Sequence, residues 1–355
     1  PGLQVLHRFL NKHLKETLSF VHLLPFFPYS SDDGFSVIDY KDVNPDLGDW
    51  RNVELLGSDY KLMFDLVINH ISRESEWFIN YLQGKDPGKD YFIEVRPGTD
   101  LSKVVRPRSL PLLTPVNTPD DTRYVWTTFS DDQIDLNFAN PRVLYEMIGI
   151  LLFYMSHGAR MIRLDAIAYL WKEPGTSCIH LPETHEIAKL LRDVMELVDP
   201  QSILLTETNV PNKENLSYFG NGDEAHMVYQ FSLPPLLLHA LYRGNASRLT
   251  EWAKSISGIP GGCTFFNFTA SHDGIGVRPL EGILAEEERD ELIEAMKKNG
   301  AKISTRRQSD GTDSPYEINI TYFDAMKRTI EGEDDLQVKR FIASQTIMME
   351  LKGIP

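Results

Sequence analysis

The chain has 355 residues, of which 51 are acidic and 36 basic, giving a formal net charge of −15 at pH 7. This acidity excludes nucleic acid as an expected partner, since binding a phosphate backbone needs clustered cations. The 42% hydrophobic residues suffice for a large core, whereas two cysteines exclude a disulfide framework. The chain also lacks the run of about 18 apolar residues that a membrane span needs.

Apolar periodicity predicts the elements in chain order. Four leucines at helical spacing between residues 3 and 14 predict a first helix. Farther along, Asn140 suits a helix N-cap, Pro141 the first helical position and Gly158 the C-terminal end. The expected helices are 1–15, 140–155, 183–198, 286–298 and 335–351, and the expected strands are 20–24, 62–68, 161–165, 203–207, 226–229 and 264–269.

Strands that alternate with helices predict parallel pairing, and nearly continuous apolar strands predict a sheet covered on both faces. We therefore expect an α/β fold of the (β/α)₈ TIM type. Six strands fall short of the eight that such a barrel contains. Because the chain also opens at Pro1 rather than methionine, we expect an incomplete barrel from a longer enzyme, lacking the first strand and the last strand and helix.

Two stretches interrupt the alternation. Residues 71–140 are rich in Pro, Asp and Arg and lack clean helical periodicity, which predicts a subdomain inserted after the third barrel strand. Residues 1–70 would then form the first part of the barrel. Residues 141–355 would form the remainder, with a long loop insertion at about 274–320.

Acidic residues close several expected strands. Asp65, Asp165 and Glu207 lie at or near C-terminal strand ends, and Asp273 follows a later strand. In a barrel of this type that face carries the active site. Paired carboxyl groups suit glycoside chemistry, in which one attacks the anomeric carbon and the other protonates the leaving oxygen. Arg163 would share the strand face of Asp165 and hold that carboxylate ionised. The alternative is that each acid caps a helix or forms a structural ion pair.

Four segments together resemble the signature regions of the α-amylase superfamily: DLVINH (65–70), RLDA (163–166), TET (206–208) and SHD (271–273). Five others resemble the sucrose phosphorylase subfamily: PFFP (25–28), DDGF (32–35), EPGTSC (173–178), PPLLLHAL (234–241) and HDGIGV (272–277). Within that subfamily, RPRSLPLLT (106–114) and RPLEGIL (278–284) look more like the glucosylglycerate and glucosylglycerol phosphorylases.

This resemblance implies a role for each matching residue. Asp165 resembles the nucleophile, Glu207 the general acid/base and Asp273 the carboxylate that stabilises the transition state. Residues that resemble contacts to the bound glucose or to the catalytic acids are Asp32, Phe35, His70, Phe129, Gln133, Arg163, Tyr169, Tyr229 and His272. Each has an alternative: the histidines could be satisfied structural residues, the phenylalanines could belong to the core, and Asp65 could brace the arginine and histidine side chains.

A phosphorylase resolves the covalent sugar with phosphate and needs cations or hydrogen-bond donors near the acceptor. Arg106, Arg108 and Arg278 are the candidates, unless they only pair with surplus acids. We expect a retaining glucoside phosphorylase that releases α-glucose 1-phosphate from a small glucoside, with an anionic aglycone such as glycerate. The alternatives are sucrose phosphorylase proper and an amylase-type α-glucosidase or transglucosidase. A non-enzymatic binding module is disfavoured because all three acids are present.

The same chemistry defines the expected partners. Carboxylate catalysis requires neither a metal ion nor an organic cofactor, so inorganic phosphate enters only as a co-substrate. The expected partners are a small-molecule glucoside and phosphate. We expect no nucleic acid and no membrane as partners, consider a homodimer as an open alternative to a monomer, and expect a cytoplasmic location.

Overall fold

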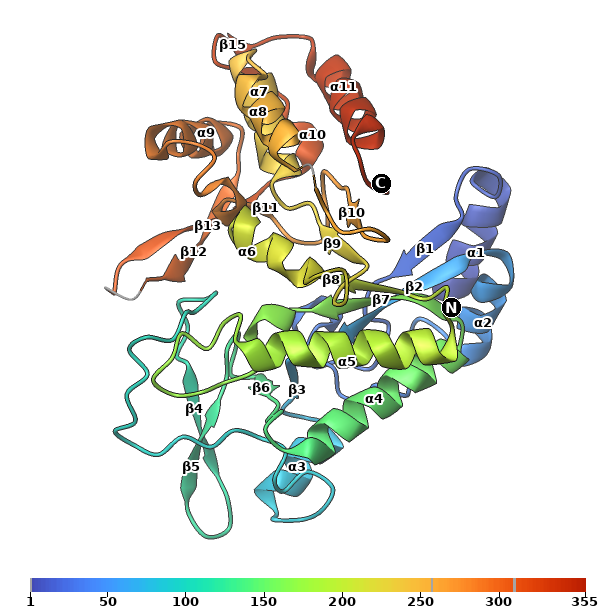
Figure 1. Cartoon of the computed structure of the whole chain (residues 1–355), viewed down its shortest axis with the longest axis vertical. Helices are drawn as coiled ribbons and strands as arrows, with labels where there is room; N and C mark the ends of the chain where they lie inside the picture. The colour runs from blue at the N-terminus through green and yellow to red at the C-terminus, as the bar shows by residue number, and fades with distance from the viewer. Residues whose placement is uncertain (1, 257, 309–310) are drawn as a thin grey trace. The chain divides into compact units, whose positions relative to one another are not determined.

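The computed structural model describes residues 2–256, 258–308 and 311–355 (Figure 1). The chain divides into two compact units, Pro1–Glu207 and Thr208–Pro355. The elements of the first unit are α1 (Gly2–His13), β1 (Phe20–Leu23), η1 (Asp32–Gly34), α2 (Trp50–Asp59), β2 (Lys61–Val67), β3 (His70–Ser72), α3 (Glu76–Leu82), β4 (Leu113–Asn117), β5 (Thr122–Trp126), β6 (Gln133–Asp135), α4 (Pro141–Ser156), β7 (Ala159–Asp165), η2 (Ile167–Tyr169), α5 (Pro182–Val198) and β8 (Ile203–Thr206).

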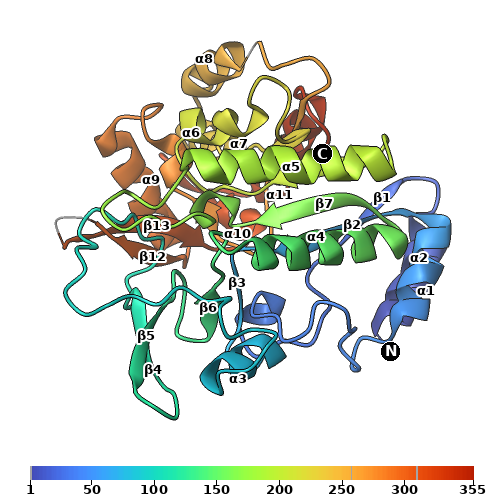
Figure 2. The same ribbon diagram turned by 60° about the horizontal axis from the view of Figure 1, so that its bottom comes forward.

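Four parallel strands form the centre of the first unit, in the order β1-β2-β7-β8. The expected parallel pairing is therefore confirmed. Leu62, Phe64 and Leu66 of β2 are fully buried, and so is the intervening Asp65. Because both faces of β2 are covered, the strand is apolar after its exposed first residue, Lys61, except for this one acid. Helices α4 and α5 run alongside β7 (Figure 2).

The capping signals at α4 act as predicted, because the Asn140 side chain accepts a hydrogen bond from the Arg142 amide and Pro141 opens the helix. Helix α2 was not expected. Its start depends on a capping box in which the Asp49 and Asn52 side chains each accept the other residue's amide hydrogen. Two of its residues, Val53 and Leu56, are buried, so few apolar positions mark this short helix in the sequence.

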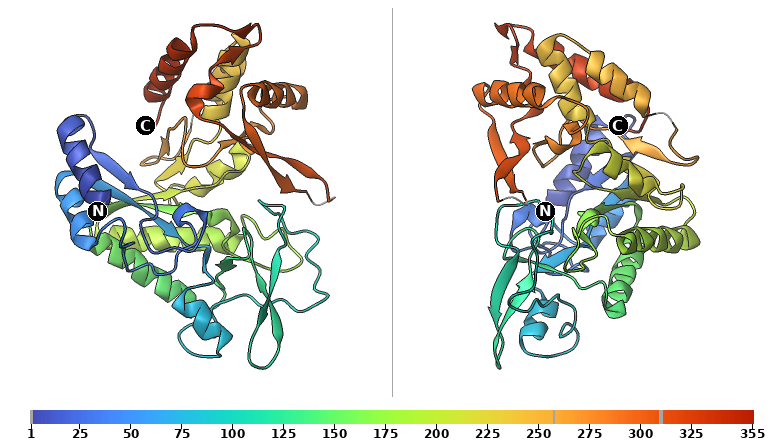
Figure 3. Two further views of the ribbon diagram at one scale, coloured as in Figure 1. Left: turned by 180° about the vertical axis from the view of Figure 1, so that it is seen from behind. Right: turned by 60° about the vertical axis from the view of Figure 1, so that its left-hand side comes forward.

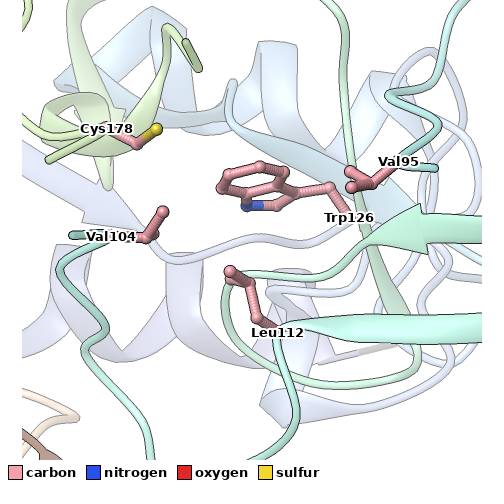
Figure 4. Packing of buried hydrophobic residues seen from close by; sticks show 5 residues of the cluster. All are labelled: Val95, Val104, Leu112, Trp126 and Cys178. Atoms are coloured by element: carbon pink, nitrogen blue, oxygen red, sulfur yellow. The ribbon is translucent and has the colours of Figure 1, made fainter. Parts of the chain in front are cut away.

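The predicted inserted segment contains α3 and two small antiparallel sheets, β3–β6 and β4–β5. The β4–β5 ribbon stands apart from the parallel strands (Figure 3, left). A small core packs around Trp126, with Val95, Val104, Leu112 and Cys178 (Figure 4). Cys178 comes from outside the predicted boundaries, so this core extends beyond residues 71–140. The boundaries themselves stay a prediction.

The elements of the second unit are α6 (Asn212–Leu216), η3 (Ser217–Phe219), β9 (Met227–Tyr229), α7 (Leu233–Arg243), α8 (Ser247–Ser255), β10 (Thr264–Phe266), β11 (Ile275–Gly276), η4 (Arg278–Leu280), α9 (Glu286–Lys298), β12 (Lys302–Arg307), β13 (Asp313–Asn319), α10 (Tyr322–Ala325), β14 (Arg328–Thr329), β15 (Gly332–Glu333) and α11 (Gln337–Glu350). Strands β9 and β10 pair in parallel, as expected. Strand β10 ends at Phe266, three residues earlier than the expected strand at 264–269.

The expected loop insertion at about 274–320 is more structured than its sequence suggests. It holds α9, with the predicted bounds, and an antiparallel sheet in the order β11-β13-β12. Residues 309–310 of this segment lie outside the described residues. Strand β12 has no fully buried residue, so it lacks the apolar alternation by which a strand is identified. Among the helices that the structure describes, none is long and apolar enough to cross a membrane.

Candidate active site

Strand register brings two of the predicted catalytic acids to one edge of the sheet. Asp165 is the last residue of β7 and lies beside Val67 of β2, while Leu164 lies beside Thr206 of β8. The Glu207 amide then donates to the Leu164 carbonyl at 3.1 Å. Because neighbouring parallel strands end at the same edge, Asp165 and Glu207 share the edge at which sites form in such sheets.

The backbone between these acids makes a direct contact with one of them. Ala166, the residue after Asp165, has a left-handed backbone with φ 52°. Its amide donates to Oε2 of Glu207 at 3.1 Å. The carboxyl group of Glu207 is therefore held against the peptide that follows Asp165, and the two acids belong to one local arrangement.

Arg163 orients Asp165. Its Nη1 donates to Oδ1 of Asp165 at 2.8 Å and to Oδ1 of Asp65 at 2.5 Å. Nε2 of His22 lies 2.7 Å from the other oxygen of Asp65. Burial alone would raise the pKa of Asp65, but Arg163 and His22 outweigh it and hold the pKa below its usual value. Arg163 also lies over the Phe35 ring, 5.6 Å from its centre.

These contacts favour the structural alternative for Asp65, which is fully buried and braces the arginine. The shared strand face predicted for Arg163 and Asp165 is confirmed by their hydrogen bond. His22 was not predicted. It belongs to β1, a strand whose residues alternate between half-buried and buried, and it is not part of any of the sequence motifs.

Four of the predicted sugar-binding residues form one hydrogen-bonded group. Nε2 of His70 donates to the Phe35 carbonyl at 2.8 Å, and its Nδ1 accepts from Nδ2 of Asn69 at 3.2 Å. The Gln133 amide nitrogen donates to Oδ2 of Asp32 at 2.9 Å and lies 3.2 Å from the His70 ring. His70 is thus a satisfied buried residue, and its contact with a sugar stays a prediction.

Phe129 connects this group to the segment after Asp165. Its ring centre lies 5.2 Å from that of His70 and 5.6 Å, edge-on, from that of Tyr169. Tyr169 belongs to η2, directly after the strand end, and is 6% exposed. Aromatic rings can pack on the C–H surfaces of a sugar as well as on each other. Both roles remain compatible with this packing.

A buried ion pair beside His70 was not predicted. Nζ of Lys172 lies 2.5 Å from Oδ2 of Asp135 and donates to Oδ1 of Asn69 at 2.6 Å. The amide and hydroxyl of Thr128 also donate to the Asp135 carboxylate. Burial lowers the pKa of Lys172, and Asp135 opposes that shift.

Among the described residues, no group of three or more His, Cys, Asp or Glu side chains is arranged to hold a metal ion.

The third predicted acid belongs to the second unit. Asp273 lines a cavity of about 280 Å³ together with Phe231 and Phe268, and its carboxylate lies 3.3 Å from Nε2 of His272. The Tyr229 ring packs edge-on against Phe268 with 5.2 Å between ring centres. His272 therefore contacts the acid next to it in sequence, which agrees with its structural alternative as well as with a contact to a catalytic acid, so its role stays a prediction.

The three predicted acceptor arginines have different surroundings. Arg278, on η4, is 6% exposed, and its Nε lies 3.9 Å from Oε1 of Glu281. Nη2 of Arg306 lies 3.5 Å from the same oxygen. Arg106 and Arg108 belong to the first unit and are half-buried in the inserted segment. The ion pair of Arg278 agrees with its structural alternative, while the acceptor roles stay predictions.

The chain matches known proteins along its whole length. The family model for the α-amylase catalytic domain matches residues 14–262. The glucosylglycerate phosphorylase of Escherichia coli is 53% identical, over 99% of this chain and 63% of that protein. The glucosylglycerate phosphorylase of Spirochaeta thermophila is 54% identical, over 99% of this chain and 60% of that protein. The chain thus spans less than two thirds of the length of these relatives.

A solved structure agrees with the fold. The crystal structure of sucrose 6F-phosphate phosphorylase from Thermoanaerobacter thermosaccharolyticum matches with a TM-score of 0.86 and 26% identity, over 100% of this chain and 73% of that chain. Together with the family model, this similarity confirms the predicted α/β fold class.

Proposed function

This chain belongs to the α-amylase family, and from that premise we propose that its protein is a retaining glucoside phosphorylase. The observation that carries the proposal is the paired arrangement of two carboxyl groups at adjacent strand ends. Asp165 is held by Arg163, and Glu207 is held by the amide of Ala166. Retaining chemistry needs such a pair at a separation of about 5–5.5 Å.

In the first step, an oxygen of Asp165 forms a bond to the anomeric carbon while the bond to the aglycone oxygen breaks. Glu207 gives its proton to that oxygen, which leaves as an alcohol. In the second step, a phosphate oxygen attacks the anomeric carbon and displaces Asp165, while Glu207 takes up the phosphate proton. Two inversions retain the α-configuration, so the product is α-glucose 1-phosphate.

Arg163 suits the nucleophile role of Asp165. A guanidinium within 2.8 Å stabilises the carboxylate and so keeps Asp165 ionised, as attack requires. We propose Asp273 as the third carboxylate, which stabilises the positive charge that develops on the sugar ring. Phe35, His70, Phe129, Gln133, Asp32, Tyr169 and His272 are proposed as groups that bind the glucosyl unit or support the acids. Phosphate is the only co-substrate in this scheme, and no cofactor takes part.

We propose that the aglycone is anionic and resembles glycerate. Identities of 53% and 54% to glucosylglycerate phosphorylases support this choice. Arg106, Arg108 and Arg278 supply guanidinium groups that suit a carboxylate on the aglycone or the attacking phosphate.

The test compares phosphorolysis of glucosylglycerate, glucosylglycerol, sucrose and sucrose 6-phosphate by the full-length protein to which this chain belongs. Glucosylglycerate should give the highest kcat/KM, measured as release of α-glucose 1-phosphate. Faster turnover of sucrose than of any anionic donor would reject the anionic aglycone. Release of glucose without consumption of phosphate would instead identify an amylase-type hydrolase or transglucosidase.

A further inference from the structure

A strained turn carries two of the proposed donor-site residues. Asp32, Asp33 and Gly34 have successive positive φ angles of 55°, 49° and 113°, and Phe35 follows directly. Glycine adopts this region readily and aspartate does so only occasionally and at a cost, so two successive aspartates there need support from their surroundings. A Cβ at residue 34 would lie 2.7 Å from the Pro25 carbonyl oxygen, so glycine is required there as well. Contacts outside the turn must therefore hold it in place.

Asp132 supplies those contacts through a serine cluster, which we define as Ser30, Ser31 and Ser36. All three hydroxyls donate to the same oxygen, Oδ2 of Asp132, at 2.6 Å from Ser30 and 2.8 Å from Ser36, with Ser31 also in contact. Two of these serines precede the strained residues and one follows them. The carboxylate therefore fixes both ends of the turn.

The other contacts of Asp132 anchor it to the inserted segment. Its carbonyl accepts from the Arg73 amide at 2.9 Å, directly after β3. The Ser30 hydroxyl also lies 2.6 Å from the hydroxyl of Ser72. Burial would raise the pKa of Asp132, but the three serine hydroxyls outweigh burial and lower it, so the acceptor is a carboxylate.

The next residue extends the same attachment into the proposed site. Gln133 donates to Oδ2 of Asp32 at 2.9 Å and lies against His70. Two consecutive residues thus hold the turn. Asp132 accepts hydrogen bonds from the serines that flank the turn, and Gln133 donates one to the strained Asp32. Gln133 belongs to the group of proposed sugar-binding residues, whereas Asp132 faces hydroxyls of the protein itself.

We propose that Asp132 is a positioning residue, which sets the donor affinity of the site by holding Asp32 and Phe35 in the strained turn through the serine cluster. This inference rests on the proposed function. A neutral amide oxygen accepts fewer and weaker hydrogen bonds than a carboxylate, so Asn at residue 132 cannot hold all three hydroxyls. The turn would then relax away from the geometry that binds the glucosyl unit.

The experiment compares Asp132→Asn with Asp131→Asn in the full-length protein. Asp131 is exposed, and its carboxylate lies 4.0 Å from Nη1 of Arg73, which makes it a matched neighbour. Asp132→Asn should lower kcat/KM for the glucoside by on the order of 10- to 100-fold, chiefly through a higher donor KM, because small displacements of positioning groups have effects of this size. The KM for phosphate and all constants of Asp131→Asn should stay at wild-type values.

Hydrogen exchange supplies a readout that does not require activity. The amides of Phe35 and Ile38 bond within the turn and its flanks, so their exchange should accelerate in Asp132→Asn and not in Asp131→Asn. The single changes Ser31→Ala and Ser36→Ala should each accelerate the exchange of these amides by a smaller amount. They replace Asp132→Asn as the test if that variant does not fold.

The outcomes separate the two proposals. Wild-type donor kinetics and unchanged exchange in Asp132→Asn and both serine variants would overturn the positioning role. The positioning role would also be overturned if Asp132→Asn lowered the unfolding free energy but left the ratio of donor KM to phosphate KM unchanged. Such a result would mean that Asp132 has a purely structural role. A wild-type full-length protein that transfers no glucosyl group from any donor would reject the proposed function, while the exchange data would still decide whether Asp132 holds the turn.

Discussion

Arg163 is the residue through which the candidate site acquires its charge distribution. One guanidinium nitrogen serves both Asp65 and Asp165, and the arginine is 1% exposed. Arg163 helps to hold the pKa of Asp65 below its usual value and donates a hydrogen bond to Asp165 as well. The fully buried Asp65 orients Arg163, and Arg163 in turn orients the carboxylate of Asp165 at the end of β7.

Asp165→Asn should abolish glucosyl transfer without unfolding the chain. The amide cannot form the covalent glucosyl ester, although it still accepts a hydrogen bond from Arg163. We expect kcat for phosphorolysis to fall by on the order of 10⁴-fold or more, the range observed when an enzyme loses its nucleophile. Asp46→Asn, at an exposed position, is the matched control. Unimpaired phosphorolysis by Asp165→Asn would remove Asp165 from the nucleophile role.

Asp65→Asn should destabilise the fold in a pH-dependent way. Removing the only partner of a buried charge costs about 3–5 kcal/mol of unfolding free energy. Because Asp165 still pairs with Arg163, we expect a smaller loss for Asp65→Asn. The folded pKa of Asp65 is below its ordinary value of 3.8, so its stabilising contribution is complete above about pH 4 and is lost as the pH falls through the folded pKa. Urea unfolding should therefore separate wild type from Asp65→Asn at pH 7, and the difference should shrink near pH 3. An equal difference at both values would contradict this assignment.

At the scale of elements, the pair Lys172–Asp135 joins the segment after β7 to strand β6 of the insertion. Asn69, between β2 and β3, accepts from the same ammonium group. Three segments that are distant in sequence thus meet at one buried charge. The neighbouring Thr128 precedes Phe129, so this pair also supports an aromatic residue of the proposed donor site.

Lys172→Met should lower the unfolding free energy by about 3–5 kcal/mol, because it leaves the Asp135 carboxylate buried without a cation. Adding Asp135→Asn should restore part of that loss, since no uncompensated charge then remains. The measurement is chemical denaturation of the two single variants and the double variant. Strictly additive losses would show that the two side chains do not act as a pair.

Elements with local signals were predictable, whereas those without them were not. Helix α4 was predicted from Asn140, Pro141 and Gly158, and its capping contact is present. Helix α7 was overlooked because it is apolar on nearly every side, with nine of its eleven residues buried, and such a helix shows no periodicity. Lys172 carried no signal either, since a lone lysine in a loop resembles any exposed lysine until the fold buries it.

The candidate site divides in the same way. Asp165 and Glu207 could be placed at neighbouring strand ends because strand boundaries and parallel order follow from sequence. The contacts of Asp132 could not be predicted from the sequence. They join residues 30–36 to residue 132 through side-chain hydroxyls, and the direction of these hydroxyls depends on three positive φ angles. Sequence patterns describe periodicity along the chain and contain little information on such turns.

At the scale of the whole molecule, the net charge of −15 at pH 7 should dominate behaviour in solution. Repulsion between like-charged molecules disappears as the pH approaches the isoelectric point of about 5.1, so association should increase there. We expect a turbidity maximum near that pH at low salt, and clear solutions at pH 7. A turbidity that is constant between pH 7 and the isoelectric point would contradict this expectation. Activity losses near pH 5 should be examined for precipitation before they are assigned to a titrating catalytic group.

The left-handed backbone at Ala166 has a consequence for engineering. Directed evolution that randomises the residues around Asp165 will include this codon, since it adjoins the proposed nucleophile. A β-branched residue disfavours such a conformation and proline excludes it, and proline would also remove the donor that Glu207 accepts. Functional clones should therefore retain alanine or carry glycine or asparagine there, and library diversity is better spent on other positions.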